Sequence, residues 1–483
     1  MKQTSIKVNL IMNMILTMSS FVFPLITFPY VSRILLPEGT GKVSFATSLV
    51  SYFSMFAQLG IPTYGIRECA KVRDNKEELT RTTQELVIIN LGTTLFSYIV
   101  LFLTLESIQR LQEDKVLYII ISFSIILTAL GVEWLYKALE QYTYITVRSV
   151  IFKFLALIAM FLLIHQKSDY VIYGGITIFA ASASNIFNFI NLHKYIYTRL
   201  VGKYNFKRHI KPICVFFAMA CASTIYTNLD NVMLGFMSTD AEVGYYNAAV
   251  KIKTILVSIV ISLGTVLLPR ASYYVENRMF DEFRRIAQKA LSFVFFIATP
   301  LMVYFTFFAR EGIYFLSGEA YNNSIIPMQI IMPTLLLIGI TNILGVQILV
   351  PLGKEKIVLY SEIAGALVDI IINVILIPKF ASVGAAIGTL VAEFIVLVVQ
   401  YLSLRHEIVN MFKQIHYIRI INAIVIALVA SFWVKKIPFG NFIILVVSSL
   451  LFFGVYGLFL LYRKEEVVVE CWNTFRNLLG FRK

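Results

Sequence analysis

The chain has 483 residues, of which 58% are hydrophobic and only 14% are charged, and its formal net charge is +14. Soluble proteins carry about 25% charged residues, and a soluble fold of this length cannot bury so much apolar surface. The composition therefore excludes a soluble globular protein and predicts an integral membrane protein.

Fourteen apolar stretches follow one another along the chain, and each is long enough to cross a bilayer as a helix of roughly 20 residues. The expected spans are residues 9–32, 43–65, 83–105, 116–136, 145–164, 170–192, 213–237, 246–269, 290–309, 325–350, 357–377, 383–404, 418–434 and 441–462. The first stretch is too long for a signal peptide, and no cleavage site of small residues follows it. We expect an all-α integral membrane protein with about fourteen transmembrane helices.

The basic residues indicate which way the chain crosses the membrane. Most Lys and Arg fall in the tails and in the loops on the side of the N-terminus, as in "HKYIYTRLVGKYNFKRHIKP" (193–212). Cytoplasmic loops carry this excess, so both termini are expected in the cytoplasm. The net positive charge then reflects loops that lie against anionic lipid, and no nucleic-acid partner is expected.

The loops argue against catalysis. The external loops are short, about 15 residues at most, which leaves no outer domain for an active site such as that of a polysaccharide polymerase. No G-x-x-x-x-G-K-[ST] phosphate loop is present, and the five histidines lack the paired spacing of metal ligands. We expect a transporter with no enzymatic activity, no cofactor and no metal site.

An internal repeat divides the chain into halves. The segment "PEGTGKVSFATSL" (37–49) precedes the second span, and "DAEVGYYNAAVKI" (240–252) precedes the eighth. Aligning Gly41 with Gly244 gives an offset of 203 residues, or six helices, which preserves orientation. The pattern predicts two parallel six-helix repeats that form a V-shaped transporter with a central cleft, plus two C-terminal helices.

The repeat also sets the expected domain boundaries. They are an N-terminal bundle at 1–197, a basic cytoplasmic linker at 198–212, a C-terminal bundle at 213–404, helices 13 and 14 at 405–462, and an amphipathic cytoplasmic tail at 463–483.

Three stretches of the chain resemble a known family. They are "FPYVSRILLPEGTGKVSFATSLVSYFSMFAQLGIPTYGIRECAKVR" (28–73), "GVEWLYKALEQYTYITVRSVIFK" (131–153) and "YTNLDNVMLGFMSTDAEVGYYNAAVKI" (226–252). They are similar to the polysaccharide flippases of the Wzx type, in the multidrug/oligosaccharidyl-lipid/polysaccharide exporter superfamily. The resemblance covers essentially the whole chain, including the number of spans and the duplication.

The resemblance implies an activity in the bacterial cytoplasmic membrane. Such proteins move undecaprenyl-diphosphate-linked oligosaccharide repeat units from the cytoplasmic to the outer leaflet by alternating access, for capsule, O-antigen or exopolysaccharide synthesis. The implied partners are this lipid-linked oligosaccharide, membrane lipids, a polysaccharide polymerase and glycosyltransferases. Lipid II flippases and multidrug or cation antiporters of the same superfamily are the alternatives. Residues 9–32 contain no Asp or Glu, which disfavours a cation extruder, because these usually carry acidic groups in the cavity.

Four basic residues are candidates for binding the diphosphate. Lys153, Lys251 and Lys253 lie inside expected spans, where a cation costs at least ~2.5–3.5 kcal/mol and tends to mark a cavity or a site. Lys251 and Lys253 point about 200° apart on a helix, so at most one should face a cleft. Both could instead extend to the interface, and Arg33, beside the first external loop, could be a plain surface residue.

Acidic and amide residues supply the remaining candidates. Asp369 and Glu393 lie deepest in their spans and could couple transport to H⁺ or Na⁺. Alternatively, each forms a structural ion pair or hydrogen bond. Asn185 and Asn188, three residues apart, could contact sugar hydroxyls or join helices by hydrogen bonds.

Overall fold

The computed structural model describes residues 6–438, 440–465, 468–469 and 472–473, and every regular element in these ranges is a helix. The chain divides into two compact units, Met1–Gly244 and Tyr245–Lys483. Most of the expected tail at 463–483 lies outside the described residues.

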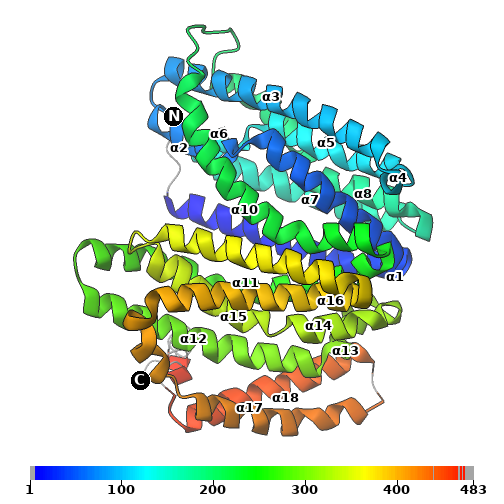
Figure 1. The fold of residues 1–483 in the computed structure, drawn as a ribbon, viewed down its shortest axis with the longest axis vertical. Coiled ribbons are helices and arrows are strands. Elements are labelled where there is room, and N and C mark those ends of the chain that lie inside the picture. The colour runs from blue at the N-terminus through cyan, green and yellow to red at the C-terminus, as the bar shows by residue number, and fades with distance from the viewer. Residues whose placement is uncertain (1–5, 439, 466–467, 470–471, 474–483) are drawn as a thin grey trace. The chain divides into compact units, whose positions relative to one another are not determined.

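The first unit is built around one long helix. Its elements are α1 (Ile6–Gln58), α2 (Ile61–Lys71), α3 (Lys76–Ser107), α4 (Gln109–Gln112), α5 (Lys115–Gly131), α6 (Glu133–Ala138), α7 (Tyr142–Leu163), η1 (Lys167–Asp169), α8 (Tyr170–Ile178), η2 (Phe179–Ala183), α9 (Asn185–Asn191), η3 (Leu192–Lys194), α10 (Lys207–Met237) and the start of α11 (Asp240–Glu276) (Figure 1).

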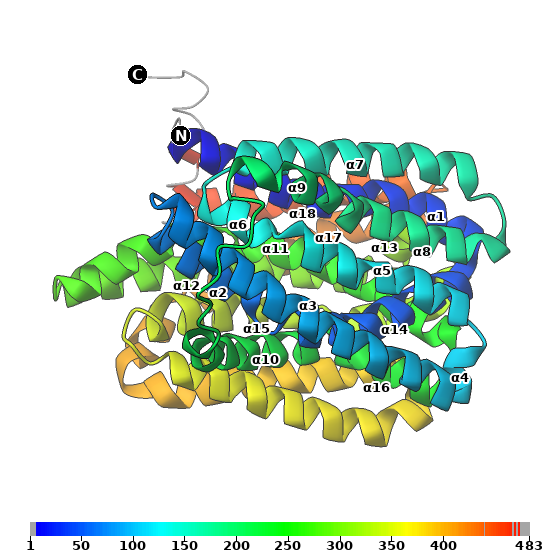
Figure 2. The ribbon, with the colours of Figure 1, turned by 90° about the horizontal axis from the view of Figure 1, so that it is seen from above.

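Helix α1 contacts α3, α5, α7 and α10, and α3 runs beside α5 (Figure 2). Helix α1 breaks at Leu36, whose φ is 59°, directly before Pro37. Proline removes a backbone donor and disfavours a helical residue in front of it, so a break is expected there. The expected first external loop is therefore a break between two helical arms.

Two glycines bring α1 and α11 into backbone contact. A Cβ atom on Gly41 would lie 1.7 Å from the carbonyl oxygen of Asp240, and one on Gly244 would lie 2.0 Å from that of Pro37. The contact is reciprocal, because Pro37 and Asp240 are separated by the same 203 residues as Gly41 and Gly244. Both contacts lie within the first unit and join residues that the predicted repeat makes equivalent.

The second unit contains the rest of the chain. Its elements are the remainder of α11, then α12 (Phe280–Phe307), α13 (Ala309–Ser317), η4 (Glu319–Ser324), α14 (Ile325–Ile331), α15 (Thr334–Asn342), η5 (Ile343–Leu349), α16 (Glu355–Lys413), α17 (Tyr417–Phe432), η6 (Trp433–Lys436) and α18 (Asn441–Tyr462).

Helix α16 folds into a hairpin of two arms that meet at Ala381, where φ is 47°. The arms approach closely because Gly384 lies against the backbone of Leu376; a Cβ atom there would lie 2.7 Å from the Leu376 carbonyl. Helices α17 and α18 also pack on each other (Figure 1). The helices on either side of Pro333 are bent by 44°, as a proline inside a span favours.

The described chain has ten helices long and apolar enough to cross a membrane, or up to eleven if the bent pair at Pro333 forms one span. Two of the ten, Ile11–Lys71 and Glu355–Arg405, contain the breaks at Leu36 and Ala381. A further apolar helix, α5, is shorter. The all-helical, multi-pass membrane architecture is confirmed, whereas the count of fourteen spans stays a prediction.

The compact units do not follow the linker at 198–212, because α10 packs on α1 and α2 within the first unit. The linker itself lies along α3. Gln84 donates to the carbonyl of Arg199 at 2.9 Å and accepts from the hydroxyl of Tyr204 at 2.9 Å. The boundaries of the six-helix repeats remain a prediction.

Candidate functional site

The first unit contains a polar cavity of about 360 Å³. Its wall comes from the end of α1, from α2, α3, α5 and α6, and from η2 and α9. The polar side chains of this wall are Gln58, Thr63, Asn90, Thr128, Glu133, Lys137, Ser182 and Asn185. Gln58 is the last residue of α1 and Glu133 is the first residue of α6, so the cavity lies beside helix termini of the first unit.

A cluster of three charged side chains forms one side of this cavity, and Glu133 and Lys137 in it are partly exposed. The carboxylate of Glu133 accepts from Lys137 Nζ at 2.8 Å and lies 3.3 Å from Arg148 Nη2. Arg148 is almost fully buried, and its Nη1 donates to the carbonyl of Ser184 at 2.6 Å and to Asn185 Oδ1 at 3.1 Å. Because arginine has only donors, the oxygen of the Asn185 amide must face it, and Asn185 Nδ2 is left for another partner.

Only one of the two predicted sugar-contacting asparagines lines the cavity. Asn185 does so, whereas Asn188 is fully buried and is absent from the cavity wall. The backbone carbonyl of Asn188 accepts from the Tyr136 hydroxyl at 2.6 Å. Its side-chain amide has no hydrogen-bond partner among the described residues.

Lys153, on α7, reaches α1 within the first unit. Its ammonium donates to the hydroxyls of Ser19 at 2.8 Å and Ser20 at 2.9 Å. No acidic side chain of the described part of the chain forms an ion pair with it. Its hydrogen-bond partners are therefore two neutral hydroxyls, and the carboxylate of Glu133 acts on the charge only from a longer distance.

The other predicted cationic residues have different surroundings. Lys251 and Lys253 are half-buried on either side of the fully packed Ile252 of α11. Arg33 is exposed, and its guanidinium donates to the carbonyl of Pro29, one turn back in α1. The structure thus brings none of these three into the cavity of the first unit.

The predicted acidic residues lie in the hairpin of α16. Asn373 Nδ2 donates to Asp369 Oδ1 at 3.2 Å, and both side chains are buried. Gly388 of the opposite arm lies directly against them; a Cβ atom there would lie 2.7 Å from Asp369 Oδ1. Glu393 is also buried on this arm. One turn before Glu393, Thr389 shares a 2.8 Å hydrogen bond with the hydroxyl of Tyr246.

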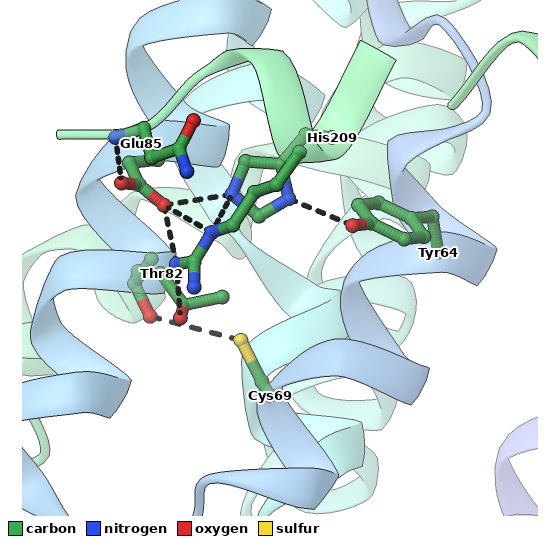
Figure 3. Close-up of polar contacts among 8 residues, drawn as sticks. Tyr64, Cys69, Thr82, Glu85 and His209 are labelled. Carbon is green, nitrogen blue, oxygen red and sulfur yellow. Dashed lines mark hydrogen bonds and ion pairs between the residues drawn. The ribbon is translucent and has the colours of Figure 1, made fainter. Parts of the chain in front are cut away.

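A second polar cluster joins α3 to the beginning of α10 (Figure 3). The carboxylate of Glu85 is fully buried and accepts from the backbone amide of Asn205 at 2.6 Å, from Arg208 Nε at 3.1 Å and from His209 Nε2 at 2.7 Å. The other ring nitrogen of His209 lies 2.7 Å from the Tyr64 hydroxyl. Every group in this cluster has a partner, so it fixes the linker and α10 on α3.

Sequence reasoning missed Glu133 and Arg148. Both lie near the expected ends of spans four and five, where charged residues are ordinary, so nothing singled them out. The available signal was the i, i+4 spacing of Glu133 and Lys137, which is typical of paired charges on one helix face.

Together, the apolar helices, the polar cavity and the buried charges define a multi-pass membrane protein with the architecture of a transporter. A solved structure named "Lipid II flippase MurJ, inward closed conformation" is similar, with a TM-score of 0.73, 18% sequence identity and coverage of 93% of this chain and 99% of that chain. An inward-facing multidrug resistance MATE family transporter of the MOP superfamily is also similar, with a TM-score of 0.61 and 14% identity over 82% of this chain and 96% of that one.

Matches to protein families and to a related sequence show to which family of membrane proteins the chain belongs. Residues 6–275 match the family described as "Polysaccharide biosynthesis protein", and residues 215–375 match the MatE family. A protein of Escherichia coli (strain K12) named "Putative O-antigen transporter" is 25% identical over 411 residues, which cover 83% of this chain and 97% of that protein. The chain belongs to the polysaccharide biosynthesis protein family, as its resemblance to Wzx-type flippases predicts.

Proposed function

We propose that this protein flips undecaprenyl-diphosphate-linked oligosaccharide repeat units from the cytoplasmic to the outer leaflet of the bacterial cytoplasmic membrane. The cargo would serve capsule, O-antigen or exopolysaccharide synthesis. The family, the name of the E. coli relative and the similarity of the fold to a flippase support this assignment.

One observation carries the proposal further than the family does. Lys153 holds a positive charge within a membrane helix, and its hydrogen-bond partners in the structure are two serine hydroxyls. A cation within a membrane span is costly and tends to line a cavity or a site, so such a charge is expected to have a function. A diphosphate would supply the missing negative charge through charge-assisted hydrogen bonds.

The proposed mechanism is alternating access. The sugars and the diphosphate would enter a polar passage open to the cytoplasm, while the lipid tail stays in the bilayer. Closure on the cytoplasmic side and opening on the other would then release the cargo outside. Both termini would be cytoplasmic, as the basic loops indicate, and Lys251, Lys253 and Arg33 remain further candidates for binding the diphosphate.

Ion coupling is proposed at Asp369. Its carboxylate is buried and hydrogen-bonded to a neutral amide, so binding of H⁺ or Na⁺ would change its charge in a low-dielectric site. A group of this kind can bias a two-state equilibrium if the ion binds one state better than the other. Glu393 is the second candidate.

Asp369→Asn tests the coupling. Asparagine keeps an oxygen that can accept from Asn373 but removes the charge. Transport by the variant should lose its dependence on the H⁺ or Na⁺ gradient, while Glu355→Gln, at the exposed start of α16, should behave like the wild type. Unaltered ion dependence in Asp369→Asn would rule the coupling role out.

Deletion of the gene in its own host tests the proposed function. Undecaprenyl-diphosphate-linked repeat units should accumulate on the cytoplasmic leaflet and surface polymer should disappear, and the wild-type gene should restore it. Normal surface polymer in the deletion strain would contradict the proposal. If expression instead changes resistance to cationic drugs, the protein is a multidrug antiporter.

A further inference from the structure

The polar cavity of the first unit has the wrong charge arrangement for a diphosphate. Arg148 is the most buried cation beside it, but Arg148 is already bound by Glu133, Ser184 and Asn185. Lys137, the other cation on the wall, is paired with the same Glu133 carboxylate, so a diphosphate would have to displace Glu133 from both of its cationic partners. The diphosphate is therefore a poor occupant of this cavity.

The groups that line the cavity instead suit an uncharged, hydroxyl-rich ligand. Amides of Gln58, Asn90 and Asn185, the carboxylate of Glu133 and the indole of Trp134 supply both donors and acceptors. A sugar hydroxyl donates one hydrogen bond and accepts others, so it matches such a mixed wall. The volume of about 360 Å³ lies at the small end of ligand pockets, which is suitable for a single sugar or a short oligosaccharide.

Several of these groups are held in place and keep free capacity. Arg148 orients the Asn185 amide, so that Asn185 Nδ2 remains available. Each Glu133 oxygen has one cationic partner and can accept a further hydrogen bond. Trp134 is fixed by Gly65 of α2, where a Cβ atom would lie 2.7 Å from the indole ring. The wall is thus pre-organised before any ligand arrives.

We infer that this cavity is a recognition site for an uncharged sugar of the lipid-linked cargo, separate from the groups that bind the diphosphate. Glu133 and Asn185 form the principal hydrogen bonds, Gln58 and Asn90 extend the polar wall, and Trp134 borders the sugar. The inference rests on the proposed function, because it takes the sugar to be part of the flipped lipid.

Trp134 provides a direct probe of this site. The chain has only three tryptophans, so Trp433→Phe and Trp472→Phe leave Trp134 as the single fluorophore. The purified full-length protein in lipid nanodiscs is titrated with the methyl glycosides of glucose, galactose and N-acetylglucosamine, with glucuronate and with inorganic pyrophosphate. We expect at least one neutral sugar to change the Trp134 emission saturably and pyrophosphate to have no effect.

Substitutions of cavity residues test whether the change in Trp134 emission comes from binding in the cavity. Glu133→Gln and Asn185→Ala should each weaken sugar binding by about tenfold or more. Each variant removes a charge or an amide that forms a hydrogen bond with the sugar, and losing such a bond has an effect of this size. Asn323→Ala, an exposed asparagine of the second unit, is the matched control and should leave binding unchanged. Unchanged binding in both cavity variants would overturn the assignment.

The outcomes separate this inference from the proposed function. If no neutral sugar changes the emission but the same preparation flips its lipid-linked cargo, the sugar site is wrong and the function stands. If pyrophosphate saturates the signal, the cavity binds the diphosphate and the inference fails. If sugars bind but flipping is absent, the proposed function fails and the sugar site remains.

Discussion

Lys153 is the residue whose charge matters most to this account. Its ammonium donates hydrogen bonds to the neutral hydroxyls of Ser19 and Ser20. Hydrogen bonds to charged groups contribute about 1.5–3 kcal/mol. Lys153→Ala should therefore lower cargo export about tenfold or more, measured as surface polysaccharide per molecule of membrane-inserted protein.

The conservative change separates charge from shape. Lys153→Arg keeps the positive charge and should retain part of the activity, whereas Lys436→Ala, which removes an exposed lysine, should have no effect. Wild-type export by Lys153→Ala at normal abundance would remove Lys153 as a binding residue.

Glu85 is expected to matter for stability and not for the cargo. It is fully buried and accepts hydrogen bonds from Asn205, Arg208 and His209. Removing one partner from such a buried network costs about 3–5 kcal/mol, because the remaining donors lose their acceptor. Glu85→Ala should therefore lower the melting temperature of the purified protein.

The matched control is Glu77→Ala, which removes an exposed ion pair with Arg81 on the same helix. Exposed pairs contribute about 0–1 kcal/mol, so the melting temperature should hardly change. Equal melting temperatures for the two variants would show that the Glu85 cluster does not fix α10 on α3.

At this scale the sequence singles out candidate residues but not their partners. Lys153, Asp369 and Asn185 stand out because a charged or amide side chain is unusual in an apolar stretch. The cluster of Glu85 with Arg208 and His209 could not be predicted, since more than 100 residues separate its members. One sequence carries no signal that pairs residues so far apart.

At the scale of elements, the crossing of α1 and α11 depends on glycine. A Cβ atom on Gly41 would lie 1.7 Å from a backbone oxygen, and neither helix can yield by moving a side chain. Overpacking of this kind typically costs about 1–3 kcal/mol. Gly41→Ala and Gly244→Ala should both force the helices apart at this point and lower thermal stability and export together.

Gly92→Ala on α3 is the control, because nothing lies within 4 Å of its added Cβ atom. Alanine favours a helix over glycine by up to about 1 kcal/mol, so this variant should be as stable as the wild type or slightly more so. Wild-type behaviour of Gly41→Ala would mean that the two helices do not need to touch.

The periodicity and length of the apolar stretches predicted most helices, but not the form of their connections. The expected loops after spans one and eleven are breaks at Leu36 and Ala381 inside long helices. A turn that needs only one non-helical residue leaves little trace in composition. The bend of 44° lies at Pro333, where proline removes a backbone hydrogen bond of the helix.

At the scale of the whole molecule, composition was sufficient to predict an all-helical membrane protein. The repeat offset of 203 residues also separates the residues that make the reciprocal contacts of Gly41 and Gly244. The compact units could not be predicted in the same way. The division at Gly244 follows from the packing of α10 on α1 and α2, and packing partners are not encoded in the hydrophobic pattern of a single helix.

The most direct test of the central claim is a flipping assay with the purified protein in proteoliposomes. A fluorescent undecaprenyl-diphosphate-linked oligosaccharide is placed in both leaflets, and a membrane-impermeant quencher reports how much of it reaches the outer one. Vesicles with wild-type protein should expose nearly all of the lipid with time, and vesicles with Lys153→Ala should do so at a rate lower by about tenfold or more. Wild-type vesicles that stop at the outer-leaflet half, like vesicles without protein, would contradict the account.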